Sequence, residues 1–142
     1  MRRDRRWALL APLCAVLLLP SCRDVASESV EPENEPAAVE PIEGTDLARV
    51  ILTTDAAQRI GLDTSSITVE GERMTVPASA IWVDVNGDEW VYTNPEPLVF
   101  VRAPVVVDRY VGESAVLSKG PAPETEVVSI GVAELIGSEF GI

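Results

Sequence analysis

The two cysteines, Cys14 and Cys22, are the residues of this 142-residue sequence whose position calls first for a chemical explanation. Cys14 lies within an apolar run from Trp7 to Leu19, and Cys22 follows that run directly after a Pro-Ser pair. A cysteine ordinarily forms half of a disulfide or packs as a small buried thiol. Neither use suits Cys22, because an acidic, serine-rich segment begins immediately after it. The position of Cys22 therefore indicates another use, and the segments before and after it identify that use.

The sequence has no histidine. Histidine is the commonest metal ligand and the commonest general base, so its absence excludes Ser-His-Asp chemistry and most zinc or copper sites. No pair of nucleophile and base and no constellation of carboxylates stands out elsewhere. We therefore expect no enzyme, no catalytic residue, no metal and no cofactor.

One acidic segment, "DVNGDE", invites interpretation as a calcium loop, because Asp84, Asn86 and Asp88 stand at alternate positions. An EF-hand loop needs glycine at its sixth position and glutamate at its twelfth. Here the glycine, Gly87, is at the fourth position and Pro95 is at the twelfth. The pattern favours a β-hairpin over a metal site.

The hairpin is predicted to turn over the four residues from Asp84 to Gly87. Asp suits the first position of a type I turn, Asn86 lies at its third position, and Gly87 supplies the positive φ of a following bulge. This register places Trp82 opposite Trp90. A tighter two-residue turn would instead place Trp82 opposite Val91. We prefer the first register, because it stacks the two tryptophans on one face.

The elements that surround these residues begin with an export signal. An arginine-rich start precedes the apolar run, and a small residue follows it, as in a secretory signal. The run is too short for a comfortable transmembrane helix, which needs about 20 apolar residues.

The end of this signal, "LPSC", resembles the lipobox of bacterial lipoproteins. The resemblance implies that residues 1–21 are removed and that Cys22 becomes the acylated first residue of a membrane-anchored protein facing the periplasm or the cell exterior. The alternatives are an uncleaved anchor and a plain secretory signal with a coincidental cysteine. Cleavage would leave 7 basic and 22 acidic residues, a net charge of −15, which should repel nucleic acid.

Residues 22–48 follow the signal and are rich in acidic residues and proline. Low hydrophobicity combined with high charge predicts disorder. We expect a tether that holds the next segment away from the bilayer.

Residues 49–142 change to short valine-rich runs separated by turn residues, which predicts one mainly β domain. We expect a small antiparallel barrel or sandwich of about 6–8 strands. One short helix is predicted at about 54–60, with Thr54 or Asp55 as its N-cap and Gly61 just past its end. The closing "VAELIGSEFGI" suggests a further short helix and an apolar terminus. A break in alternation at Pro104 predicts an edge or a bulge.

The same residues resemble the C-terminal part of the periplasmic adaptor (membrane fusion) proteins of RND-type efflux pumps. The resemblance covers about residues 49–142 through "VPASAIWVDVNGDEWVYT", "FVRAPVVV", "SKG" and "EVVSIGVAELIGSEFGI". The matching positions are Pro77, Ala80, Gly87, Trp90, Val91, Tyr92, Phe100, Arg102, Gly120, Val127, Val128, Gly131, Glu134, Leu135 and Gly137.

Full adaptors also carry a lipoyl-like domain, a long helical hairpin and a middle barrel, and none of these fits between Ile67 and Pro77. The resemblance therefore implies the membrane-proximal domain alone, which in the family packs against the pump. We expect an interaction module that docks on an RND transporter or a complete adaptor, with Trp82, Trp90 and Tyr92 as candidate contacts. The alternatives are that two of these aromatics fill the core, and that the chain is an independent lipoprotein binding a small or cationic ligand.

Overall fold

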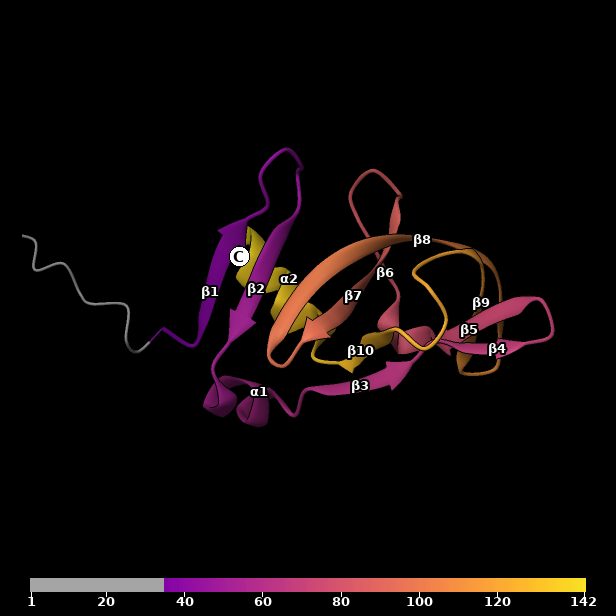
Figure 1. Cartoon of the computed structure of the whole chain (residues 1–142), viewed down its shortest axis with the longest axis horizontal. Coiled ribbons are helices and arrows are strands. Elements are labelled where there is room, and N and C mark those ends of the chain that lie inside the picture. The colour runs from indigo at the N-terminus through magenta and orange to yellow at the C-terminus, as the bar shows by residue number, and fades with distance from the viewer. Residues whose placement is uncertain (1–34) are drawn as a thin grey trace, which may run out of the picture. The chain divides into compact units, whose positions relative to one another are not determined.

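A strongly curved antiparallel sheet dominates residues 35–142, the part of the chain that the computed structural model describes (Figure 1). Seven strands follow one another round a nearly closed barrel, in the order β3-β10-β7-β8-β9-β5-β4. The mainly β prediction is therefore confirmed. The seven strands are β3 (Asp63–Ser66), β4 (Thr68–Glu70), β5 (Arg73–Pro77), β7 (Glu89–Glu96), β8 (Val99–Val111), β9 (Ser114–Lys119) and β10 (Glu126–Ile130). The predicted signal and Cys22 lie outside the described residues.

The two ends of this path meet at Ile67, which joins β3 to β4. Its N–H donates to the carbonyl of Thr125, and its carbonyl accepts from Glu124. Its side chain is fully buried in the barrel. One bent segment therefore pairs with β10 before Ile67 and with β5 after it, which nearly closes the barrel.

Strand β8 is long enough to belong to both halves of the barrel. On the side away from β7, its first residues pair with β2 (Ala48–Leu52) as far as Val101, and its pairing with β9 starts at Val106, opposite Lys119. Pro104 lies between these two pairings. Proline has no N–H to donate, but no strand pairs with Pro104 on that side of β8, so no hydrogen bond of the ladder is lost there. The local edge predicted at Pro104 is therefore confirmed.

Ordered structure begins earlier than predicted. Strand β1 (Ala37–Pro41) pairs along its length with β2, and the turn between them is held by the Thr45 side chain. The predicted tether to residue 48 is therefore wrong over residues 37–48. Four of the five residues of β1 are exposed, so backbone pairing rather than apolar burial holds this edge strand. Composition gave no sign of it.

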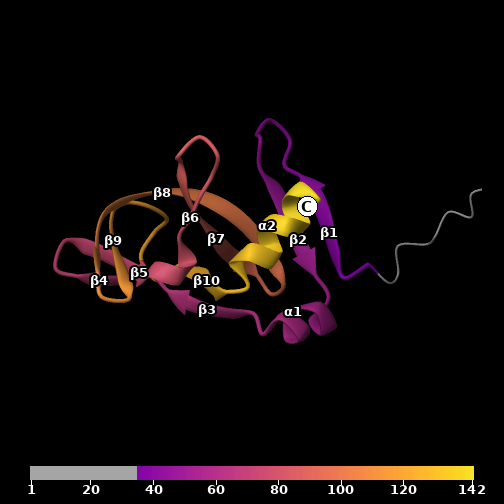
Figure 2. The same ribbon diagram turned by 180° about the vertical axis from the view of Figure 1, so that it is seen from behind.

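Two helices flank the sheet: the one predicted at about 54–60 and the further short helix suggested by the closing segment. Helix α1 (Thr54–Ile60) has the predicted bounds and ends at Gly61, whose φ is +64°. Its N-cap is Thr53, whose side chain accepts from the N–H of Ala56, and not Thr54 or Asp55. Helix α2 (Val132–Phe140) crosses the face seen in Figure 2. No helix within residues 35–142 is long and apolar enough to cross a membrane.

The core has two parts, one on each face of β7. Val91 and Tyr92 are neighbours on this strand and both are fully buried. Val91 belongs to the barrel interior, and Tyr92 to the layer between the sheet and the helices. The barrel interior comprises Ile67, Val76, Ala80, Val91, Val105, Ala115, Leu117 and Val127. The helix layer comprises Val50, Leu52, Ala56, Tyr92, Phe100, Val128, Val132 and Leu135.

The predicted hairpin joins β6 (Trp82–Val83) to β7, just after a turn of 3₁₀ helix (Ala78–Ala80). Trp82 pairs with Trp90, so the predicted register is confirmed. The N–H of Asp84 donates to the carbonyl of Asp88 over 2.9 Å, and Gly87 has a φ of +91°.

This geometry predicts how Gly87 tolerates substitution. We expect Gly87→Val to destabilise the protein by about 1–2 kcal/mol, because a β-branched residue is strained at positive φ. The cost lies in the backbone, since an added Cβ would have no atom within 4 Å. Gly87→Asn should be much milder, because Asn tolerates positive φ better. Thermal melts of the two variants measure the difference, and equal stability of both would show that the turn is wrongly assigned.

Candidate functional site

A groove of about 580 Å³ lies beside the hairpin. Four parts of the chain line it: Asp46 from the turn between β1 and β2, the β6–β7 hairpin, Arg102 of β8, and the C-terminal segment from the end of helix α2. In both ribbon views the β1–β2 and β6–β7 turns project from the same side of the sheet (Figures 1 and 2). The groove is therefore built from segments far apart in sequence.

An aromatic cluster forms one wall of the groove. The Trp82 ring is stacked near Trp90 and near Tyr92, with centroids 6.4 and 6.2 Å apart. Phe140, near the end of α2, meets the Trp82 ring edge-on at 6.2 Å. The two tryptophans are half-buried and line the groove. Tyr92 is 0% exposed, so it supports the cluster from below and does not fit the predicted role of direct partner contact.

A buried ion pair lies beneath the aromatic cluster. The Nε of Arg102 donates to Oε1 of Glu139 over 2.8 Å, and the two side chains are only 9% and 4% exposed. The guanidinium carbon of Arg102 lies 4.6 Å from the centroid of the Trp90 ring, within range of a cation–π contact. Arg102 also donates to the backbone carbonyl of Asp46. This one side chain therefore ties β8 to α2, to the hairpin and to the β1–β2 turn.

Tyr92 completes the network. Its hydroxyl donates to Oε2 of Glu139 over 2.6 Å, so both carboxylate oxygens of Glu139 are occupied. Burial, together with the neighbouring carboxylate, raises the pKa of Tyr92 well above its usual range. Tyr92 therefore stays protonated and acts as a donor at any ordinary pH.

The hairpin turn is held by Asp84. Its Oδ1 accepts from the N–H groups of Asn86 and Asp88, and its Oδ2 accepts from the Trp90 indole over 3.3 Å. Desolvation alone would raise the pKa of Asp84, but these hydrogen bonds outweigh it and lower the pKa below its usual value. Asp84, one of the predicted turn residues, thus holds the Trp90 indole in place at the groove.

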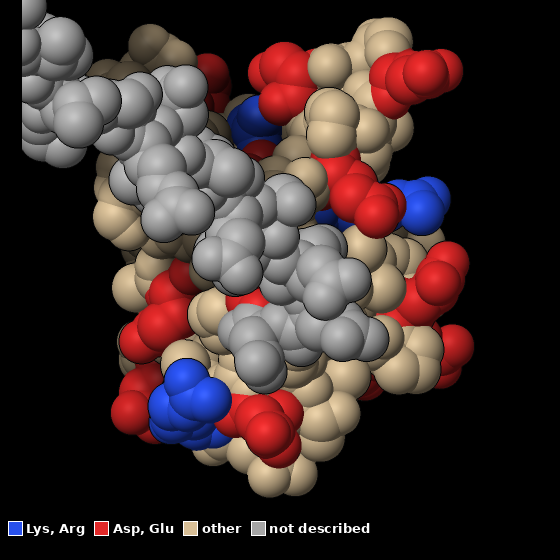
Figure 3. Space-filling model, turned by 90° about the vertical axis from the view of Figure 1, so that its left-hand side faces the viewer, with Lys and Arg blue, Asp and Glu red and all other residues tan. Residues whose placement is uncertain are grey.

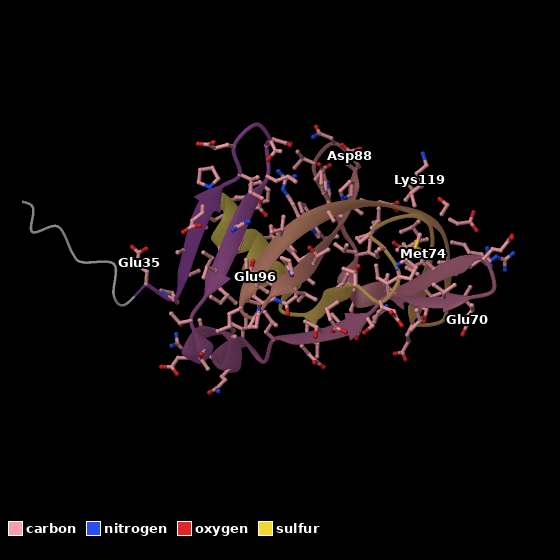
Figure 4. The ribbon with its side chains drawn as sticks, in the orientation of Figure 1. Glu35, Glu70, Met74, Asp88, Glu96 and Lys119 are labelled. Carbon is pink, nitrogen blue, oxygen red and sulfur yellow. The ribbon has the colours of Figure 1, made fainter. Side chains whose placement is uncertain are left out.

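The rim of the groove is partly apolar and partly acidic. Val85 at the hairpin tip and Ile142 beyond α2 are 102% and 91% exposed. Asp46 and Asp88 stand on the two turns, and Figure 4 labels Asp88 on the hairpin loop. Within the described part of the chain, no three or more His, Cys, Asp or Glu side chains come together as a group that could hold a metal ion.

Three comparisons bear on identity. No protein-family model, no curated protein and no solved structure matches this chain. The adaptor resemblance therefore rests on the residues quoted above, and its functional consequences are proposals.

Sequence reasoning found the hairpin and its tryptophans, but it missed the residues that complete the site. Arg102 and Glu139 lie 37 positions apart, and Phe140 and Ile142 come from the last turn of α2 and beyond. One signal was present, since Arg102 is a lone charge in the apolar run "FVRAPVVV". A charge in a buried strand needs a partner, because an unpaired buried charge is very costly.

Proposed function

We propose that this chain is a lipid-anchored interaction module that docks on an RND-type transport system, on the transporter itself or on a complete adaptor. The observation that carries the proposal is the exposed apolar rim around an aromatic-walled groove. Binding rather than catalysis is its mode of action, and its anchor is an acyl group on Cys22.

The rim has the composition of a docking surface. Aromatic residues are enriched in the cores of protein interfaces and among their energetic hot spots. Trp82 and Trp90 are half-buried here, so each is held in place while part of its ring stays open. Val83, Val85, Phe140 and Ile142 add apolar area round them, and each is at least half exposed. A partner that covers this face would remove that apolar area from water.

The architecture is compatible with the resemblance to a membrane-proximal domain. Such a domain is expected to be a small barrel completed by strands from both ends of the chain. Here β3, in the first half of the described residues, pairs with β10, near their end, so strands from both ends of this part of the chain nearly close the barrel. This agreement supports the proposal at the level of fold.

An anchor would make a modest docking surface effective. Tethering two partners to one membrane raises their effective concentration, so a weak contact can still be populated. On the face drawn in Figure 3, acidic side chains are spread among uncharged ones with fewer basic side chains, which is consistent with a domain that stands off anionic headgroups.

Photo-cross-linking in native membranes tests the docking claim. We expect a cross-linking amino acid in place of Val85, at the hairpin tip, to capture an RND transporter subunit or a complete adaptor, identified by mass spectrometry. The matched control replaces Val69, which is 47% exposed on β4, away from the hairpin (Figure 1). Equal capture at both positions, or no transport protein at either, would contradict docking through this face.

A further inference from the structure

We infer that the groove between the β6–β7 hairpin and α2 binds a small lipophilic cation, such as a quaternary ammonium compound with one or two rings. The inference goes beyond the proposed function, because such binding needs the groove but no transport partner. It rests on three properties of the groove: its size, its walls and its charge.

The size fits one small molecule. Ligand sites in proteins usually measure about 300–1,000 Å³ and combine apolar walls with a few polar groups. The groove measures about 580 Å³. A protein–protein interface normally buries about 800 Å² of the surface of each partner, which is more area than the walls of a pocket of this kind offer. The groove itself is therefore matched to a ligand rather than to a protein segment.

The walls suit an apolar or aromatic body. Trp82, Trp90 and Phe140 supply an aromatic wall, and Ile136 of α2 adds an aliphatic side chain to the lining. Both indoles are fixed, Trp90 by its bond to Asp84 and Trp82 by its contacts with three aromatic rings. A rigid aromatic wall loses little conformational freedom when a ligand binds.

The charges of the residues that line the groove favour a ligand of one sign. Asp46, Asp84 and Asp88 are the acidic residues in the lining, and Arg102 is its basic residue. The charge of Arg102 is already matched by Glu139 over 2.8 Å, and its side chain is only 9% exposed. The Oδ2 of Asp46 lies 3.7 Å from the same guanidinium, and the Asp46 side chain is 87% exposed. The open part of the groove is therefore net negative, which favours a cation and opposes an anion.

Isothermal titration calorimetry tests the inference on the full chain in phosphatidylcholine nanodiscs, with empty nanodiscs as the partition control. The probes are benzyltrimethylammonium, its neutral carbon isostere neopentylbenzene, and the anion benzylsulfonate. We expect the cation to bind at least about fivefold more tightly than the isostere, and the anion to give no heat of binding.

A pair of rim variants locates the site. Asp46→Asn combined with Asp88→Asn should weaken cation binding about fivefold and leave the isostere unchanged, because each exposed charge contributes modestly. Asp84 is kept, since it holds the turn. The matched control, Asp108→Asn with Glu113→Gln, removes two acidic charges that do not line the groove. It should bind the cation like the unmodified chain.

Three outcomes would overturn the inference. Equal binding of cation and isostere would show an apolar groove without charge selection. Equal loss of cation affinity in the rim and control variants would show a general effect of the protein's net charge. No heat of binding of the cation to the unmodified protein, in a sample whose thermal melt shows that it is folded, would show that the groove is not a site. None of these outcomes bears on cross-linking at Val85, so the docking proposal stands or falls separately.

Discussion

Arg102→Met should destabilise the protein by about 3–5 kcal/mol, the loss expected when one partner of a buried ion pair is removed. Methionine keeps the apolar stem but leaves the Glu139 carboxylate, which is 4% exposed, without its counter-charge. It also removes the bond to the Asp46 carbonyl and the contact with the Trp90 ring. A domain of this size has a total stability of roughly 5–15 kcal/mol, so a large part of it is at stake. Urea denaturation followed by circular dichroism measures the change.

The same strand offers a matched control. Arg109 also pairs with an acidic residue, Asp108, at 2.5 Å, but the two side chains are 42% and 55% exposed. Exposed pairs contribute about 0–1 kcal/mol, so Arg109→Met should cost little.

A second variant separates loss of the pair from loss of packing. Adding Glu139→Gln to Arg102→Met removes the orphaned charge, while the amide oxygen can still accept from Tyr92. We expect the double variant to recover roughly half of the loss, because much of the cost of breaking such a pair lies in the charge left behind. Similar effects of Arg102→Met and Arg109→Met, or no recovery in the double variant, would contradict a structural role for the buried pair.

The position of the Arg102–Glu139 pair has a consequence for the groove. Arg102 supports Trp90 from one side, and Glu139 holds the last turn of α2. Loss of the pair should therefore loosen both walls of the groove at once. We therefore expect the proposed binding to weaken together with stability.

Local signals explain which elements could be predicted from the sequence. Helix α1 was found because Gly61 ends it and small apolar residues face inward, and the hairpin was found because Gly87 needs a positive φ. Both features depend on residues close together in sequence. Strand β1 carried no such signal, since its side chains are exposed and its stability comes from pairing with β2.

The site was predicted only in part for a related reason. The stacking of Trp82 on Trp90 followed from the hairpin register, which is local. The burial of Tyr92 depends on α2, which arrives about 40 residues later in the chain and covers that face of β7. Long-range packing of this kind cannot be derived from spacing alone.

Cys22→Ala should abolish attachment of the protein to the membrane. In the proposed account Cys22 carries the acyl groups, and two or three chains suffice for stable anchoring where a single chain is marginal. Alanine has no sulfur to acylate, so the effect should be complete rather than partial. Cys14→Ala is the matched control, because Cys14 lies within the predicted signal, and it should change nothing.

Metabolic labelling with a palmitate analogue tests the central claim of a lipid-anchored module most directly. The account predicts that label is incorporated into the unmodified protein and into Cys14→Ala, both recovered in the membrane fraction, and that Cys22→Ala takes up none. Equal labelling of Cys22→Ala and the unmodified protein, or no label in either, would contradict it.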